Sequence, residues 1–168
     1  MKLADVKPML LPTSIRRVND KLYRGNAIFS PIKALRLKKI GITQVIDLRH
    51  EDGIFVNLFK SLEKFYCKML NIKYYHTNFY NKNDYSIPNN DFFEGINKII
   101  DDNKKSYVHC HYGKHRTGFT VAMYEKSIGI PSNKIITELL KYGWKRNKKP
   151  ELQASLEAFL QKFFKPNN

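Results

Sequence analysis

The stretch from Ser106 to Gly129 reads SYVHCHYGKHRTGFTVAMYEKSIG and has three parts of different character. Ser106 to His109 is typical of a short strand, and Thr117 to Ile128 is apolar and helical, with Gly129 as its stop. The residues between them form a short loop. A strand, a loop and a helix in this order place the loop at the carboxyl end of a strand, where α/β proteins bind their ligands.

The loop from Cys110 to Arg116 has the features needed to hold one phosphoryl group. It is short enough for its backbone N–H groups to curl round an anion, and the helix that follows adds its positive N-terminal end. Gly113 removes a Cβ where the backbone must bend sharply. Arg116 offers a planar fork of donors that matches two phosphate oxygens. We therefore expect a phosphate-binding loop.

A cysteine at the base of such a loop predicts covalent catalysis. Cations and a helix N-terminus lower the pKa of a thiol, so Cys110 is expected to be a thiolate at neutral pH and to attack phosphorus. Thr117 can donate its hydroxyl to the sulfur and help it leave, and His109 is expected to orient the loop through backbone hydrogen bonds. The sequence thus predicts a phosphatase that forms a phosphocysteine and needs no metal or other cofactor.

The rest of the chain alternates strand and helix patterns. This order predicts an α/β fold with a central, mostly parallel sheet of four to five strands flanked by helices. We expect one domain over residues 1–168, with loose ends at 1–12 and 165–168. The predicted strands are Lys21–Arg24, Thr43–Leu48, Lys73–Phe79 and Ser106–His109. The predicted helices are Pro31–Ile40, Asn57–Leu70, Asp91–Asp102, Thr117–Ile128, Ser132–Tyr142 and Glu151–Phe164.

The run HCHYGKHRTG at 109–118 resembles the H-C-x5-R-(S/T)-G signature of the protein tyrosine phosphatase superfamily. The chain length resembles its compact dual-specificity branch, and Leu22–Gly25 and Val45–Arg49 are similar to its early strands. The resemblance spans roughly Val18 to Phe159. It implies a dual-specificity-phosphatase-like fold and a phosphoric monoester hydrolase.

The resemblance also implies a general acid that protonates the leaving oxygen, usually an aspartate on a mobile loop before the nucleophile. Asp84 lies in the polar stretch 81–90, 26 residues before Cys110, and is the predicted acid. Asp91 is the alternative, although it has the position of a helix N-terminal residue. The Trp-Pro-Asp tripeptide of many relatives is absent.

The residues within and after the loop bear on the substrate class. A Gly-Lys-x-Arg-Thr-Gly loop resembles members acting on phosphoinositides or inositol phosphates, including phytase-like bacterial enzymes. Such a substrate is the first hypothesis, and a phosphotyrosine or dual-specificity protein phosphatase is the second. An RNA 5′-triphosphatase and an inactive phosphate-binding module are further alternatives. The predicted substrate-binding residues are His111, Tyr112, Gly113, Lys114, His115 and Gly118.

The chain carries 30 Lys and Arg against 15 Asp and Glu, a formal charge of +15. This excess favours polyanionic partners: a phosphorylated substrate, small molecule or phosphoprotein, and an acidic membrane surface. General lysine richness is the alternative. No nucleic-acid-binding motif accompanies the charge. The chain is expected to be a monomer.

The N-terminal residues resemble no signal peptide, and no apolar run approaches the roughly 20 residues that span a bilayer. The cytoplasm is the predicted location, although a protein exported by a dedicated secretion system would look the same. The two cysteines suggest neither a disulfide framework nor a zinc site. Cys67 is predicted to be a packed core residue, with a redox role toward Cys110 as the alternative. Arg49 is predicted to lie at the surface, where it could also touch substrate.

Overall fold

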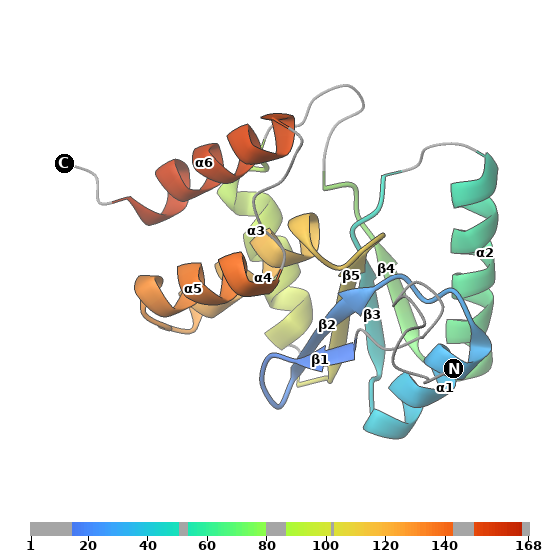
Figure 1. Cartoon of the computed structure of the whole chain (residues 1–168). Coiled ribbons are helices and arrows are strands. Elements are labelled where there is room, and N and C mark those ends of the chain that lie inside the picture. The colour runs from blue at the N-terminus through green and yellow to red at the C-terminus, as the bar shows by residue number, and fades with distance from the viewer. Residues whose placement is uncertain (1–14, 51–53, 80–86, 102, 143–149, 166–168) are drawn as a thin grey trace, which may run out of the picture.

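A computed structural model describes residues 15–50, 54–79, 87–101, 103–142 and 150–165 (Figure 1). Its sheet has five strands in the order β1-β2-β5-β3-β4. β1 runs antiparallel to β2, and the other neighbours are parallel. This confirms the predicted α/β fold with a mostly parallel sheet. The strands are β1 (Ile15–Arg17), β2 (Leu22–Asn26), β3 (Gln44–Asp47), β4 (Lys73–His76) and β5 (Ser106–Cys110).

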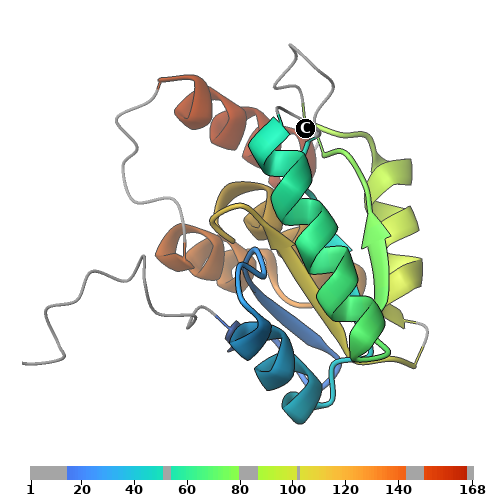
Figure 2. The ribbon, with the colours of Figure 1, turned by 90° about the vertical axis from the view of Figure 1, so that its right-hand side faces the viewer.

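Helices cover both faces of the sheet. Figures 1 and 2 show from two directions that a group of helices lies on each face. The first pair is α1 (Pro31–Ile40) and α2 (Ile54–Met69). The second group is α3 (Asn90–Asp101), α4 (His115–Ser127), α5 (Ser132–Tyr142) and α6 (Pro150–Phe164).

Side chains that alternate along the strands divide the core between these two faces. Val45 and Tyr107 pack with the residues of α1 and α2, whereas Ile46 and Val108 pack with α3 to α6. The larger half is rich in phenylalanine, and the rings of Phe119 and Phe159 stack with centroids 4.1 Å apart. The helix that follows Cys110 is therefore anchored at its buried side by an aromatic core.

Local sequence signals set the ends of α1. The Ser30 hydroxyl accepts a hydrogen bond from the Lys33 backbone N–H at 3.3 Å, and Pro31 stands at the first helical position. Gly41 ends the helix with a φ of 90°, in the left-handed region, and donates its N–H to the last-turn carbonyl groups. Both ends agree with the prediction.

One strand and several element bounds differ from the sequence-based expectation; β4 ends at His76 rather than Phe79, and α4 begins at His115 rather than Thr117. The antiparallel edge strand β1 was not predicted, because three residues are too few to show an alternating pattern. α2 begins at Ile54 rather than Asn57. The apolar residues Leu58, Leu62, Phe65 and Met69 of α2 point to solvent. Its buried side carries Lys60 and Glu63 together with Cys67. Among the described helices, none is both long enough and apolar enough to cross a membrane.

Candidate active site

The loop of interest leaves the sheet at the carboxyl end of its central strand. β5 ends at Cys110 beside Asn26 of β2, and β3 flanks its other side, with Asp47 opposite His109. α4 begins at His115, and the Lys114 side chain makes no capping hydrogen bond. The first N–H groups of α4 thus keep their donor capacity at the loop.

Hydrogen bonds from outside the loop hold its carbonyl groups. The Ala27 N–H donates to the His111 carbonyl at 3.2 Å, and the buried Arg24 guanidinium donates to the Gly113 carbonyl at 3.1 Å. The Gly118 N–H donates to the Lys114 carbonyl at 2.8 Å. With the carbonyl groups held this way, the N–H groups of Gly113 and Thr117 donate to the Cys110 sulfur. The backbone thus presents donors to the point where a phosphate would sit.

Gly113 is required by this geometry. Its φ is +68°, and a Cβ there would lie 2.2 Å from the Gly25 carbonyl carbon and oxygen. The loop packs so closely on the end of β2 that no side chain fits.

The environment of Cys110 favours the thiolate. Burial disfavours the charged form, but the Arg116 guanidinium, the Thr117 hydroxyl and the two backbone N–H groups outweigh it and lower the pKa of Cys110. The Thr117 hydroxyl is buried and has no oxygen or nitrogen partner in the described part of the chain, so it is available to the sulfur. Arg116 donates to the Leu48 carbonyl at 3.1 Å, which holds its guanidinium at the end of β3.

Cys110 and Arg116 line one pocket of about 270 Å³. Of the other predicted binding residues, His111, Tyr112 and His115 line it too. Burial, followed by nearby cations, lowers the pKa of both histidines. Lys114 instead lines an adjoining recess of about 70 Å³. Gly118 lies in the first turn of α4, where it bonds the Lys114 carbonyl.

Of the two candidate acids, only Asp91 belongs to the described residues. Asp84 lies outside them. Asp91 stands in the first turn of α3, exposed, with its carboxylate 3.4 Å from the Asn89 side-chain nitrogen, and it does not line the pocket.

A buried network of charges lies beneath the loop. His109 Nδ1 lies 3.2 Å from the Cys110 carbonyl oxygen, and its Nε2 lies 2.6 Å from Glu63 Oε1, an ion pair without the alignment of a straight hydrogen bond. Burial disfavours the imidazolium, but Glu63 and Asp47 outweigh it and raise the pKa of His109. His109 thus lies between the backbone of Cys110 and α2, and its orienting role stays a prediction.

Arg49 is the centre of this network, and its predicted surface position is wrong. Its guanidinium donates to both Asp47 carboxylate oxygens at 2.7 to 3.0 Å and to Glu63 Oε2 at 2.5 Å. The residue is 3% exposed. Asp47, Glu63 and His109 have the donor types of a metal site, but Arg49 already bonds both carboxylates. A cation of the chain itself therefore neutralises them.

Sequence reasoning missed two residues that build the site. Arg24 lies 89 positions before Gly113, whose carbonyl it holds. Glu63 lies in the middle of α2 and joins Arg49 and His109. The only sequence signals for these two roles are an arginine inside a short strand and a single glutamate on a helix. Neither pattern is specific for an active site.

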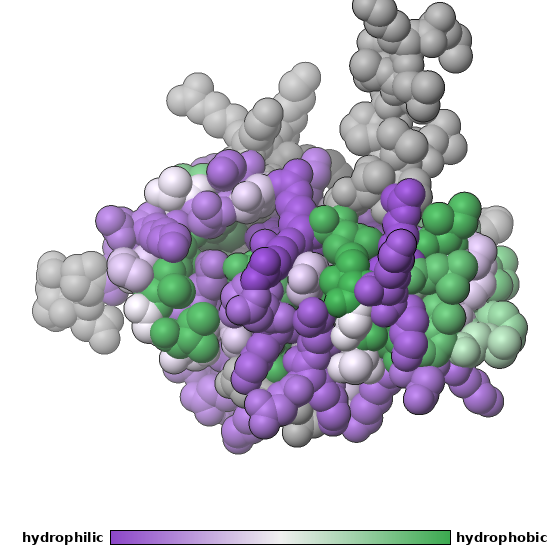
Figure 3. Space-filling view, turned by 90° about the horizontal axis from the view of Figure 1, so that it is seen from below, coloured by the Kyte–Doolittle hydropathy of each residue, from purple (hydrophilic) through white to green (hydrophobic). Residues whose placement is uncertain are grey.

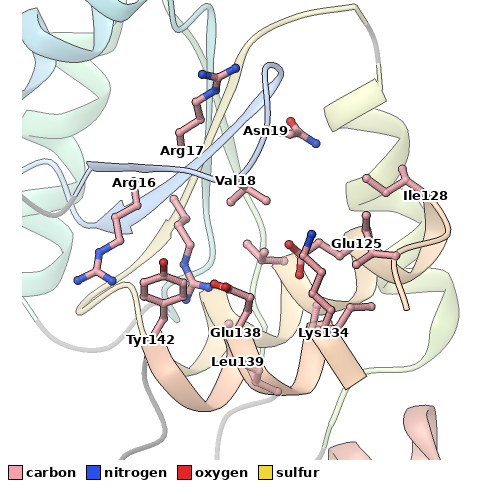
Figure 4. A pocket seen from close by; sticks show the side chains of 16 residues that line it. Arg16, Arg17, Val18, Asn19, Glu125, Ile128, Lys134, Glu138, Leu139 and Tyr142 are labelled. Atoms are coloured by element: carbon pink, nitrogen blue, oxygen red, sulfur yellow. The ribbon is translucent and has the colours of Figure 1, made fainter. Parts of the chain in front are cut away.

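A larger pocket of about 330 Å³ lies elsewhere, between β1, α4 and α5 (Figure 4). Its walls join apolar side chains to charges of both signs, among them Arg16, Glu125 and Glu138. It contains neither Cys110 nor Arg116, so its size does not make it the reaction site.

A buried cysteine of lowered pKa, surrounded by backbone donors and sharing a pocket with an arginine at the end of a parallel strand, is the arrangement of a phosphatase with a cysteine in its phosphate loop. The chain belongs to the tyrosine phosphatase family, whose sequence profile matches residues 12–162. The protein is accordingly a phosphoric monoester hydrolase. No curated protein matches the sequence.

Solved structures of low sequence identity share the fold. The core catalytic domain of the PP-IP phosphatase Siw14 from S. cerevisiae is 18% identical, with a TM-score of 0.64 over 90% of this chain and 93% of that one. TpbA of P. aeruginosa is 14% identical, with a TM-score of 0.64 over 86% of this chain and 83% of that one. The human tyrosine phosphatase-like serine/threonine/tyrosine-interacting protein is 17% identical, with a TM-score of 0.60 over 90% and 98%.

Proposed function

We propose that the protein hydrolyses phosphomonoesters through a phosphocysteine, and that its substrate is an inositol phosphate or a phosphoinositide. One observation carries the mechanism: Cys110, with its lowered pKa, shares a pocket with Arg116 at the start of a helix whose first N–H groups have no side-chain cap.

In the first step the Cys110 sulfur attacks phosphorus, and the bond between phosphorus and the leaving oxygen breaks. Arg116 and the loop N–H groups bind the equatorial oxygens as charge shifts among them. An acid, for which Asp84 remains our candidate, gives its proton to the leaving oxygen. In the second step water attacks phosphorus, one of its protons returns to the acid, and the bond between phosphorus and sulfur breaks. Phosphate is released, and Thr117 stabilises the departing thiolate with its hydroxyl.

Cations beside the pocket support a substrate with several phosphates. Tyr112 lines both the reaction pocket and the adjoining recess, and Lys114 and Arg16 line that recess with it. A phosphate next to the reacting one could bind there, one aromatic ring away. The fold shared with Siw14, described as a PP-IP phosphatase, points the same way.

A phosphotyrosine protein is the second candidate substrate. The family match and the Tyr112 ring, 65% exposed beside the pocket, favour it, since such a ring can pack against a substrate aromatic ring.

The deciding experiment measures phosphate release without metal from inositol hexakisphosphate, a soluble phosphoinositide and a phosphotyrosine peptide. We expect the inositol compounds to be hydrolysed fastest, and Lys114→Ala to raise their KM severalfold while leaving the peptide unaffected. Cys110→Ser should abolish release and Cys67→Ser should keep it. Substantial activity of Cys110→Ser contradicts the mechanism; preference for the peptide contradicts the substrate.

A further inference from the structure

The outward side of α2 carries a stripe of large apolar side chains. Its members follow a spacing of three and four residues, so they lie above one another along a single face of the helix. Their exposed fractions are 54%, 39%, 56% and 69% for Leu58, Leu62, Phe65 and Met69. Figure 2 shows the outer side of α2 with no described element over it. Exposed apolar stripes of this length mark a surface that binds something.

The charge network beneath the active site explains why this helix is turned with its apolar residues outward. The side of α2 that faces the sheet carries Lys60 and Glu63, which are 4% and 0% exposed. Glu63 bonds Arg49, and Lys60 Nζ donates to the Arg49 carbonyl at 3.1 Å. Because these polar groups support the catalytic loop, the apolar stripe is left on the outer surface.

α1 extends the same surface. Ile32 and Leu35, on its outer side, are 57% and 56% exposed. Figure 3 shows green apolar side chains gathered on the right, over α1 and α2, with purple hydrophilic ones between them. We call the outer sides of α1 and α2 the α1/α2 face.

The charged residues of the α1/α2 face all have one sign. Neither helix has an exposed acidic side chain, because Glu63, their one acidic residue, is buried. Exposed acidic residues such as Glu94, Glu151 and Glu157 lie on the other side of the sheet. The exposed cations of the face are Arg36, Lys38, Lys39, Lys64 and Lys68.

Aromatic contacts join the α1/α2 face to the mouth of the reaction pocket. The rings of Phe59 and Phe29 meet edge to face with centroids 5.7 Å apart, and Phe29 and His111 do so at 5.3 Å. His111 in turn contacts Tyr112 at 4.5 Å, and both line the pocket. A surface that covers the α1/α2 face therefore ends beside the pocket that holds Cys110.

We propose that the α1/α2 face docks on the surface of an anionic phospholipid bilayer. The stripe, about 17 Å long at 1.5 Å per residue, would enter the interfacial layer, and the surrounding cations would meet anionic headgroups. Charge complementarity favours this occupant over a second copy, which would bring cations against cations. The inference rests on the proposed function and narrows it, because docking this face would bring the pocket to the headgroups of phosphoinositides.

Vesicle binding tests the proposal without catalysis. Full-length Cys110→Ser is sedimented with vesicles of phosphatidylcholine alone and with added phosphatidylinositol. We expect binding only to the anionic vesicles and loss of it at high salt. Adding Leu62→Gln and Phe65→Gln should weaken binding about tenfold or more, whereas Leu140→Gln, an equally exposed leucine of α5, should not. Lys64→Glu with Lys68→Glu should weaken it too, unlike Lys98→Glu on α3.

Several outcomes would overturn the docking proposal. One is absence of binding to either vesicle, and another is binding that the α2 substitutions leave unchanged. If Leu62→Gln with Phe65→Gln instead changes the mass in sedimentation, a second copy occupies the face. If the protein binds no vesicles and Leu62→Gln with Phe65→Gln lowers its Tm, a segment of the chain itself covers the α1/α2 face.

The docking proposal and the substrate proposal can be contradicted independently of each other. Hydrolysis of soluble inositol phosphates by a protein that binds no vesicles keeps the function and removes the docking. Vesicle binding by a protein that hydrolyses only phosphotyrosine peptides keeps the docking and removes the substrate.

Discussion

The two cysteines, considered residue by residue, have opposite chemistry because of their neighbours. Cys110 faces Arg116 and backbone N–H groups, which lower its pKa against the effect of burial. Cys67 lies in the core beside the carboxylates of Glu63 and Asp47; burial, reinforced by these charges, raises its pKa to about 12. Only Cys110 combines a stabilised thiolate with a place in the reaction pocket.

Labelling with iodoacetamide at pH 6 should therefore modify Cys110 and leave Cys67 unmodified. Arg116→Ala removes the positive charge that lowers the pKa of Cys110, so labelling at pH 6 should slow by about tenfold or more and recover at higher pH. Peptide mass spectrometry over a pH series measures both thiols, and Arg36→Ala, an exposed arginine of α1, is the control. Equal labelling of the two cysteines would contradict the assigned environments.

A second residue-scale prediction concerns two glycines with positive φ. Gly113→Ala should reduce kcat more than a hundredfold and lower the free energy of unfolding by about 2 kcal/mol or more, because its Cβ meets the Gly25 backbone at 2.2 Å. Gly129 has a φ of +81°, but a Cβ there would meet nothing within 4 Å. Gly129→Ala should therefore lower the free energy of unfolding by only about 1 kcal/mol and keep activity. Urea unfolding and steady-state kinetics on both variants test this. Similar behaviour of the two would show that close packing of the loop is unimportant.

Residue-scale reasoning from sequence succeeded where the relevant neighbours are close along the chain. Cys110, Gly113 and Arg116 lie within one loop, so the pocket that Cys110 and Arg116 share could be expected from spacing alone. Arg49 was misplaced because its partner Glu63 lies on another element and only the fold brings them to 2.5 Å. Arg24 was missed for the same reason.

At the scale of elements, α2 supports the site from a distance. Its buried Glu63 bonds Arg49 and pairs with His109, whose ring lies beside the Cys110 carbonyl. The apolar spacing in its sequence predicted a helix and was right about that. The spacing could not show which side of α2 faces the core, because periodicity identifies a face without saying whether the core or solvent covers it.

Glu63→Gln should destabilise the protein by about 3 to 5 kcal/mol, because it leaves Arg49 and His109 short of a buried counter-charge. It should also change the pH dependence. The raised pKa of His109 contributes stability that is complete below pH 6.5 and is lost as pH rises through the folded pKa. In Glu63→Gln the pKa of His109 should be raised less, so the loss of stability with rising pH should be smaller than in wild type.

Urea unfolding of wild type and Glu63→Gln at a series of pH values from 5.5 to 9 measures both effects, with the exposed Glu94→Gln as the matched control. A loss of stability no larger than that of Glu94→Gln would mean that the network does not hold α2 to the loop.

At the scale of the whole molecule, the sheet separates two differently charged sides. The α1/α2 face presents only cations, whereas exposed acidic residues such as Glu94, Glu151 and Glu157 lie with α3 and α6. The formal charge of +15 was plain in the sequence, but its distribution depends on which helices share a face of the sheet. Cation repulsion and anion binding should therefore both influence the stability of the folded state.

Sulfate should stabilise the protein more than sodium chloride of equal ionic strength, because it binds the loop of the folded state and not the unfolded chain. At one hundred times its Kd an anion contributes about 2.7 kcal/mol, which raises the Tm of a domain of this size by roughly 5 to 10 °C. Arg116→Ala should remove most of this difference and Arg36→Ala should retain it. General salting-out by sulfate acts on all three proteins alike, so only the part that depends on Arg116 reports the site. An equal response of Arg116→Ala and wild type in calorimetry would mean that the loop does not bind the anion.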